Sequence, residues 1–335
     1  MSRLIEAALP FWLDRPDVEA LEIAAEAEAA GLHGLWLGEM STYDAFALAT
    51  AVGSCGSGLR LHLGPLPISV RNPVGLALGA SSVASLTGAE VSIALGASSP
   101  PIVTGWHDRE WDGSVARMRE TVECLRKILD GERSDYQGRV VRSQGFRLRH
   151  PIPGARVGVG AFGPGMIRLA AEVADELVLN LATPARVAEV REQLDSHAAA
   201  AGRVRPHLTV WVPAAVDPGQ ASRDQLAGQL AVYLAPPGYG EMFAGLGYGD
   251  LVELARSGTR RADVARAIPV ELTGQIGAVG SPMHVAARLQ AYLAAGADTV
   301  AVVPATADDP GGRVTLRCAA ECVSGHIPAI SPGPA

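Results

Sequence analysis

The stretch GARVGVGAFGPGMIRLAAEVADELVLN, residues 154–180, combines a strand, a glycine-rich turn, a helix and a second strand. A Val-rich apolar run at 156–160 is followed by three glycines within 160–165, and apolar residues return at helical spacing from Ile167. A helix that begins directly after a strand points unpaired N–H groups beyond the strand's carboxyl end, so this pattern favours an anion site, usually for phosphate. The alternative is a turn whose glycines serve packing alone.

Short apolar strands alternate with amphipathic helices along most of the chain, as in parallel βαβ units. The sequence predicts strands at 4–9, 34–38, 59–63, 91–95, 156–160, 176–181, 208–212 and 299–303, and helices at 18–30, 46–52, 74–86, 115–129 and 282–295. The polar stretch 132–150 predicts a small hairpin. Eight successive strand-helix units predict a single (β/α)8 TIM barrel whose reactive groups lie at the carboxyl ends of the strands. A doubly wound open sheet is the runner-up.

The domain prediction follows from this pattern. Residues 1–327 form one barrel with a helical insertion at 220–276, which includes the Pro236-Pro237-Gly238 break. The Pro- and Gly-rich residues 328–335 form a mobile tail.

Composition narrows the class of protein. With 335 residues, 48% of them hydrophobic and 19% charged, the chain is typical of a globular protein, and it has neither a leader-like start nor a bilayer-length apolar run. We therefore expect a cytoplasmic protein without a membrane partner. The evenly spread net charge of −7 argues against nucleic acid, leaving a small-molecule substrate as the expected partner and a homodimer as an open possibility.

The cationic and thiol side chains limit the ligands further. Lys127 is the single lysine, so an anionic ligand must be held by arginine or by backbone N–H groups. Four cysteines are too few for a disulfide framework. Cys318 and Cys322 share a helix face but lack a second ligand pair, which favours buried thiols over a metal site.

Several segments together resemble the luciferase-like monooxygenase superfamily, and within it the branch that uses the deazaflavin coenzyme F420. They are GLWLGE at 34–39, LGPLPISVRNP at 63–73, LGASS at 95–99 and GAFGP at 160–164, supported by the helix 117–131 and by residues 288–297. The resemblance covers roughly residues 3–305 in the family's order.

The resemblance implies a set of cofactor-binding residues. The cofactor phosphate would be surrounded by a turn that offers backbone N–H groups and consists of Gly160, Ala161, Phe162, Gly163, Pro164 and Gly165. Pro164 lies in this turn but has no N–H. Gly64 and Pro65 would form a bulge with a cis peptide bond behind the ring, or else a trans turn without ligand contact. Ser98, Ser99 and Glu39 complete the set.

Strand 34–38 bears on the proton chemistry. Relatives commonly carry an acidic residue followed by a histidine here, but this chain has Glu39 and Met40. Glu39 is one candidate for proton transfer and has a structural role as its alternative. His107, after Trp106, is the nearest other imidazole, unless it serves packing. Arg71 is expected to pin its loop through an ion pair.

Trp12, Met40, Tyr43 and Trp211, together with Pro213, are candidates for the substrate pocket, although large aromatic side chains also pack at barrel rims. The favoured function is an F420-dependent oxidoreductase that moves a hydride between the deazaflavin and a small organic substrate. The alternatives are an FMN-dependent monooxygenase and a flavin-binding relative without turnover.

Overall fold

The chain closes a parallel sheet into a barrel. The computed structural model describes residues 4–10, 15–39, 41–56, 58–111 and 114–324, so the predicted tail, Trp12 and Met40 lie outside the described part. The barrel strands are β1 (Leu4–Ala8), β2 (Gly34–Leu37), β3 (Arg60–Pro67), β4 (Val91–Gly96), β7 (Val157–Gly160), β8 (Glu176–Asn180), β9 (His207–Val216) and β11 (Thr299–Pro304).

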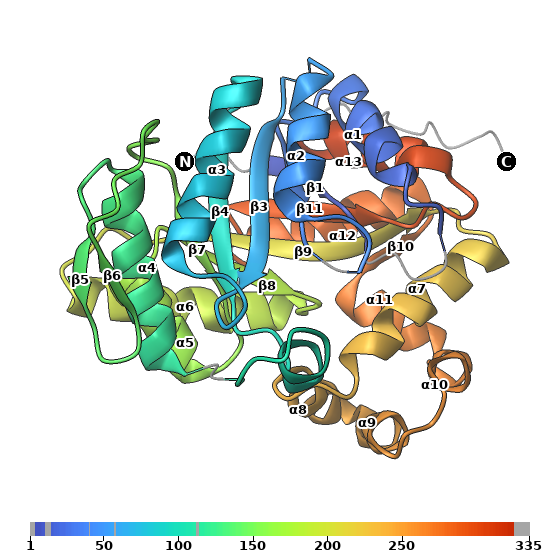
Figure 1. The fold of residues 1–335 in the computed structure, drawn as a ribbon. Coiled ribbons are helices and arrows are strands. Elements are labelled where there is room, and N and C mark those ends of the chain that lie inside the picture. Colours follow the sequence, from blue (N-terminus) through green and yellow to red (C-terminus); the bar gives the residue numbers. More distant parts are fainter. Residues whose placement is uncertain (1–3, 11–14, 40, 57, 112–113, 325–335) are drawn as a thin grey trace, which may run out of the picture.

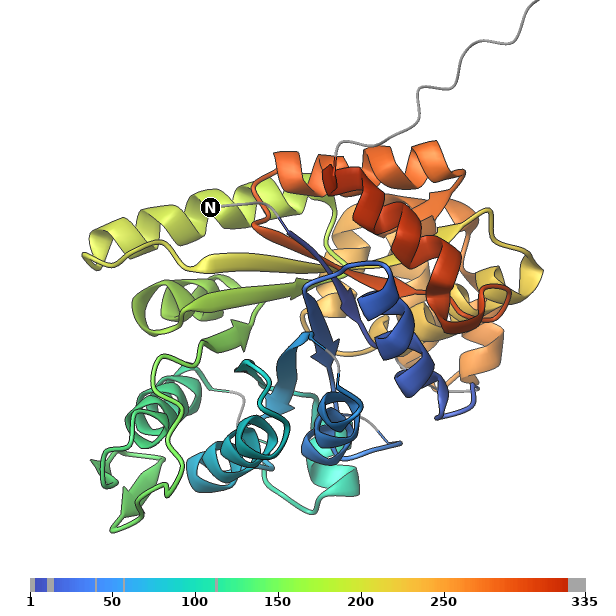
Figure 2. The ribbon, with the colours of Figure 1, turned by 90° about the horizontal axis from the view of Figure 1, so that it is seen from above.

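Strand pairing decides between the two predicted architectures. The order is β9-β11-β1-β2-β3-β4-β7-β8, all parallel, and β8 pairs again with β9 from Glu176↔His207 to Asn180↔Trp211. This last pairing closes the sheet, as the view down the molecule in Figure 2 also shows. The (β/α)8 barrel is therefore confirmed, and the open doubly wound sheet is wrong.

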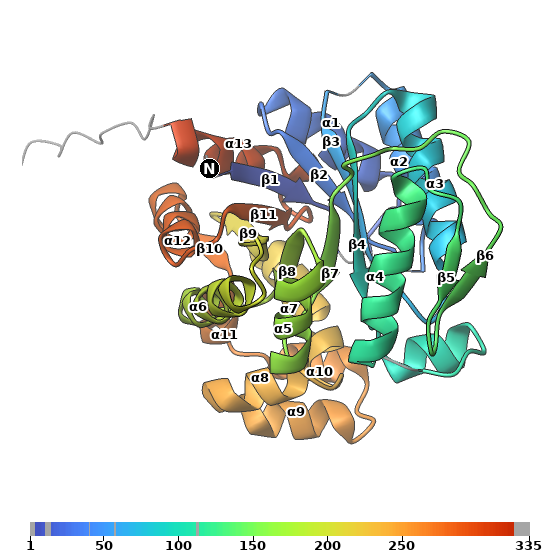
Figure 3. The same cartoon turned by 90° about the vertical axis from the view of Figure 1, so that its left-hand side faces the viewer.

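Helices cover the outside of the barrel (Figure 3). They are α1 (Glu19–Ala29), α2 (Ala45–Ser54), α3 (Pro73–Thr87), α4 (Val115–Leu129), α5 (Pro164–Val173), α6 (Pro184–Ala200), α12 (Pro282–Ala294) and α13 (Arg313–Ser324). Several begin where the sequence supplies a side-chain cap for the first N–H groups: Asp44, Asn72, Ser114, Thr183 and Ser281.

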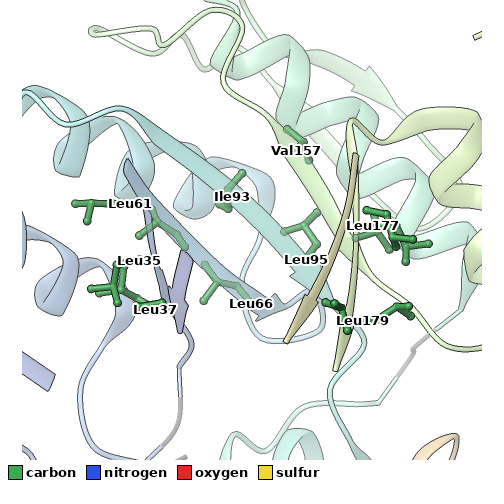
Figure 4. Packing of buried hydrophobic residues seen from close by; sticks show 14 of the residues in the cluster. Leu35, Leu37, Leu61, Leu66, Ile93, Leu95, Val157, Leu177 and Leu179 are labelled. Atoms are coloured by element: carbon green, nitrogen blue, oxygen red, sulfur yellow. The ribbon is translucent and has the colours of Figure 1, made fainter. Parts of the chain in front are cut away.

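Successive residues of each barrel strand face outward and inward in turn, which gives an apolar layer outside the sheet and another inside it. Outward-facing residues such as Leu35, Leu61, Ile93 and Leu177 are fully buried against the helices in one large cluster (Figure 4). A smaller cluster containing Ala8, Trp36, Ala94, Val178, Ala301 and Val303 lies inside the barrel.

The insertion adds a second body of helices with its own core. It contains α7 (Gln220–Tyr233), α8 (Tyr239–Phe243), the π-helix η2 (Ala244–Tyr248), α9 (Gly249–Arg256), α10 (Arg261–Ala267) and α11 (Val270–Ile276). Figure 1 shows α8, α9 and α10 together at one end of the barrel. The buried residues of the whole insertion include Leu234, Phe243 and Leu272, and Leu181 at the end of β8 joins them. The insertion is thus packed onto the barrel mouth.

Three further elements complete the chain. The predicted hairpin is present as β5 (Asp135–Gln137) and β6 (Arg142–Gln144). The strand β10 (Ala278–Gly280) was not predicted, and it pairs with an extension of β9 at Ala214–Val216. A 3-10 helix, η3 (Pro310–Gly312), precedes α13. None of the helices in the described residues is long and apolar enough to cross a bilayer.

Candidate active site

The bulge on β3 is a sterically constrained part of the barrel mouth. The Gly64–Pro65 peptide bond is cis, as predicted, and the register with β4 shifts between Leu63 and Leu66. Gly64 has φ +115°, and a Cβ there would lie 2.3 Å from the carbonyl oxygen of Ala94. Only glycine fits this position.

Two more glycines bring the bulge against the glycine-rich turn. A Cβ on Gly96 would lie 3.2 Å from Cβ of Pro65, and a Cβ on Gly160 would lie 3.2 Å from its Cγ. The Pro65 ring therefore contacts the ends of both β4 and β7. Two segments that are predicted to bind the cofactor, and that lie far apart in the sequence, are therefore neighbours in space.

The turn after β7 presents a helix N-terminus. Gly163 is the N-cap of α5 without a side-chain cap, and Pro164 is the first helical residue. The N–H of Ala161 donates to the carbonyl of Val178 at 3.2 Å, so it is not available to a ligand. Within the described part of the chain, the N–H groups of Phe162, Gly163 and Gly165 have no acceptor. The predicted anion site thus has three available donors.

The glycines of this turn are not required by a left-handed backbone. Gly160, Gly163 and Gly165 are absent from the residues with positive φ, and Gly163 has φ −81° and ψ 154°. A side chain at Gly163 would therefore not strain the backbone. A Cβ there meets no protein atom within 4 Å, which leaves an open approach to the N–H groups.

The loop after β4 carries the two predicted serines. Ser98 is exposed with φ +58°, a left-handed conformation uncommon for serine, and Ser99 is half-buried. The loop continues into the π-helix η1 (Pro101–Trp106), where the Ser99 carbonyl accepts from the N–H of Val103 at 3.0 Å. His107, which follows η1, is exposed.

Glu39 is engaged by protein groups. Its carboxylate accepts hydrogen bonds from Arg71 Nε at 3.1 Å, from Arg71 Nη2 and from the N–H of Ala45 at 3.3 Å. Arg71 also binds Asp44 and lies 4.8 Å from the Phe46 ring centre. The predicted ion pair of Arg71 is present and ties the loop after β2 to the loop after β3. These contacts match the structural alternative for Glu39, while its catalytic role stays a prediction.

A pocket opens between the barrel mouth and the insertion. Trp211 and Pro213 line it as predicted, with Asn180 and Tyr233 beside them, whereas Tyr43 is 41% exposed and does not line it. Apolar residues supply most of the remaining wall: Leu9, Leu181, Leu226, Leu230, Ile276 and Val303.

An aromatic cluster connects this pocket with the glycine-rich turn. The Phe162 ring lies 4.4 Å from that of Tyr239, which in turn lies 4.8 Å from Tyr233, measured between ring centres. The amide of Asn180 donates to the hydroxyl of Tyr239 at 3.0 Å. The insertion therefore contacts both the predicted phosphate site and the pocket.

A profile of the luciferase-like monooxygenase family matches residues 16–299 of the chain. The chain belongs to the luciferase-like monooxygenase family. It is 27% identical over 332 residues to a protein of Mycobacterium tuberculosis named as a coenzyme F420-dependent oxidoreductase, covering 90% of this chain and 94% of the relative. Membership and this relative identify the chain as an oxidoreductase of luciferase-like type, which confirms the resemblance seen in the sequence.

Two solved structures share the fold. Coenzyme F420-dependent tetrahydromethanopterin reductase from Methanopyrus kandleri aligns with a TM-score of 0.80 at 16% identity, over 97% of this chain and 99% of that one. The 3,6-diketocamphane monooxygenase of Pseudomonas putida, in complex with FMN, aligns with a TM-score of 0.71 at 18% identity, over 98% and 99%. Both cofactor types thus occur on this fold.

Sequence reasoning missed three residues of the candidate site in this luciferase-like protein. Asn180 is the last residue of β8, and its polar side chain at the carboxyl end of an apolar strand was a usable signal. Tyr233 and Tyr239 belong to the insertion, whose position over the mouth no local pattern indicates.

A buried charge cluster inside the barrel was also missed. Glu6 Oε2 lies 3.2 Å from His62 Nε2 and accepts from the Trp36 indole N–H at 2.9 Å, and His62 Nδ1 lies 2.6 Å from Ser92 Oγ. Burial raises the pKa of Glu6, but the charge and hydrogen bond of His62 and the bond from Trp36 outweigh it and lower that pKa to about 2.

Proposed function

We propose that the chain is an F420-dependent oxidoreductase that moves a hydride between the cofactor and a small organic substrate at the barrel mouth. The observation that carries this is the junction of the β3 bulge with a helix N-terminus whose N–H groups at Phe162, Gly163 and Gly165 have no acceptor among the described residues. Such a terminus suits a phosphate, which in this chain requires no lysine.

The residues present fit the cofactor. The N–H groups of Phe162, Gly163 and Gly165 would hold its phosphate, and Gly64 and Pro65 would back its ring. When bound, F420 supplies a carbon centre that accepts or donates a hydride. The protein's own part is to orient the two reactants and to exclude water, for which the pocket between Trp211 and the insertion is suited.

F420 is preferred over FMN because the relative aligned along nearly the whole chain is named for F420. FMN remains the second candidate, since an FMN complex shares the fold. A binding protein without turnover is the third, because Met40 stands where relatives commonly have histidine.

Parallel equilibrium titrations with F420 and FMN test the proposal. We expect a Kd for F420 in the micromolar range or below and at least tenfold weaker FMN binding, a difference of about 1.4 kcal/mol. Tight FMN binding without F420 binding would reverse the assignment. If the protein binds reduced F420 but no carbonyl compound oxidises it, the result would instead support the alternative of a binding protein without turnover.

A further inference from the structure

An arginine side chain bonds to the backbone of the glycine-rich turn. Nη2 of Arg186 donates to the carbonyl oxygen of Phe162 at 3.1 Å. Arg186 lies in the first turn of α6, which follows β8, and its backbone N–H donates to the hydroxyl of Thr183 at 3.2 Å. The turn after β7 is thus held from the start of the next helix around the barrel.

This bond decides where the following N–H group points. The Phe162 carbonyl and the Gly163 N–H belong to one trans peptide group, in which the C=O and the N–H point in opposite directions. Arg186 therefore directs the Gly163 N–H away from the guanidinium. Among the described residues this N–H has no acceptor, and a Cβ on Gly163 would meet no protein atom within 4 Å. The donor is fixed in one orientation before a ligand arrives.

The charge of Arg186 also strengthens this donor. A cation that bonds to the carbonyl oxygen polarises the peptide group, and the N–H of that group becomes a stronger hydrogen-bond donor. Arg186 is itself held by an ion pair, since its Nη1 lies 2.8 Å from Oε2 of Glu189. The pair is partly exposed to solvent, and such pairs contribute little to stability. The main effect of Arg186 is therefore on the turn rather than on the fold.

We infer that Arg186 is a positioning residue of the anion site, which acts through the Phe162 carbonyl to aim the Gly163 N–H at the cofactor phosphate. The inference rests on the proposed function, under which the phosphate binds at this turn. Its consequence is that Arg186 contributes to the affinity for the phosphate and not to the affinity for the ring.

Paired fluorescence titrations of the full chain separate these two contributions. One ligand is F420, and the other is its deazaflavin riboside, which has the ring and no phosphate. Arg186→Gln removes the charge and shortens the side chain, and it should weaken F420 binding about tenfold. Its affinity for the phosphate-free compound should equal that of wild type. Arg186→Lys keeps a cationic donor for this single bond and should recover most of the lost F420 affinity.

Arg203→Gln is the matched control. Nη1 of Arg203 donates to the carbonyl oxygens of Ala171 and Ala174 at 3.1 and 3.0 Å, at the opposite end of α5. The substitution removes the same kind of bond from the same strand-helix unit and should leave F420 affinity unchanged. Wild-type F420 affinity in a folded Arg186→Gln protein, or equal weakening of F420 and the phosphate-free compound, would overturn the inference.

FMN and riboflavin form a second pair that differs by a phosphate, and they separate this inference from the proposed function. If the protein binds FMN rather than F420, and Arg186→Gln weakens the binding of FMN but not of riboflavin, the cofactor proposal alone is refuted. If wild type binds F420 and the loss of Arg186 leaves that affinity unchanged, the inference alone is refuted.

Discussion

At the scale of single residues, the bulge on β3 shows how three glycines and one proline allow neighbouring strands to approach closely at the barrel mouth. Gly64 is required by its positive φ and by the carbonyl of Ala94, and Gly96 and Gly160 leave room for the Pro65 ring. The stretch LGPLP could be matched to the bulge from sequence. The glycines that surround the proline could not, because they lie on strands that become neighbours only in the closed barrel.

Glu39 offers a prediction at this scale. The Glu39 carboxylate is bound by Arg71. We therefore expect Glu39→Gln, Arg71→Gln and the double variant to reduce turnover and the free energy of unfolding by similar amounts. The effects of the two single substitutions would then not add in the double variant. Steady-state kinetics and denaturant unfolding measure the cycle. If Glu39→Gln alone lowered turnover about 10² to 10⁴-fold while Arg71→Gln resembled wild type, Glu39 would be the proton-transfer group.

At the scale of elements, the sequence was informative wherever a local pattern decides the structure. The barrel strands follow from apolar runs and the helices from amphipathic spacing, and capping residues in the sequence mark the starts of α2, α3 and α4. The three-residue strand β10 was missed because its pairing with β9 requires the long β9 extension. For the insertion, the sequence predicted helices at 220–276 but not where they lie, because their position is set by contacts with Leu181 and with one another.

The turn before α5 supplies the second prediction. Gly163→Val should fold normally, since φ −81° suits any residue and a Cβ meets no protein atom. It should weaken F420 binding about 30-fold or more, because a side chain would stand in front of the free N–H groups and remove about 2 kcal/mol of contacts. Fluorescence titration measures the affinity and far-ultraviolet circular dichroism the fold.

Gly58→Val is the matched control. Gly58 precedes β3 at the opposite end of the barrel, its φ lies outside the left-handed region, and the nearest atom to a Cβ is 3.9 Å away. Its F420 affinity should equal that of wild type. Equal affinity in a folded Gly163→Val protein would mean that the phosphate binds elsewhere.

At the scale of the whole molecule, the barrel encloses charge as well as apolar side chains. Glu6, whose pKa is lowered to about 2, stabilises the fold as an anion. The unfolded pKa is 4.5, so this stabilisation is complete above about pH 4.5 and is lost as the pH falls toward 2, amounting to about 3 kcal/mol.

Glu6→Gln tests this assignment. Over roughly the range of carboxyl titration, from pH 5 to pH 3, we expect the free energy of unfolding of this variant to fall less steeply than that of wild type. The exposed Glu110→Gln is the control and should keep the wild-type slope. Parallel slopes for wild type and Glu6→Gln, from denaturant unfolding at each pH, would remove Glu6 as a source of acid sensitivity.

We propose that F420 binds at the carboxyl-end mouth, between the β3 bulge and the 160–165 turn. Hydrogen-deuterium exchange of the whole chain, with and without saturating F420, tests it most directly. We expect slower exchange in peptides that cover 96–106, 160–167 and 226–243, and unchanged exchange in the β5–β6 hairpin, with little effect of FMN at the same concentration. Protection confined to other parts of the molecule, or none at saturating F420, would contradict it.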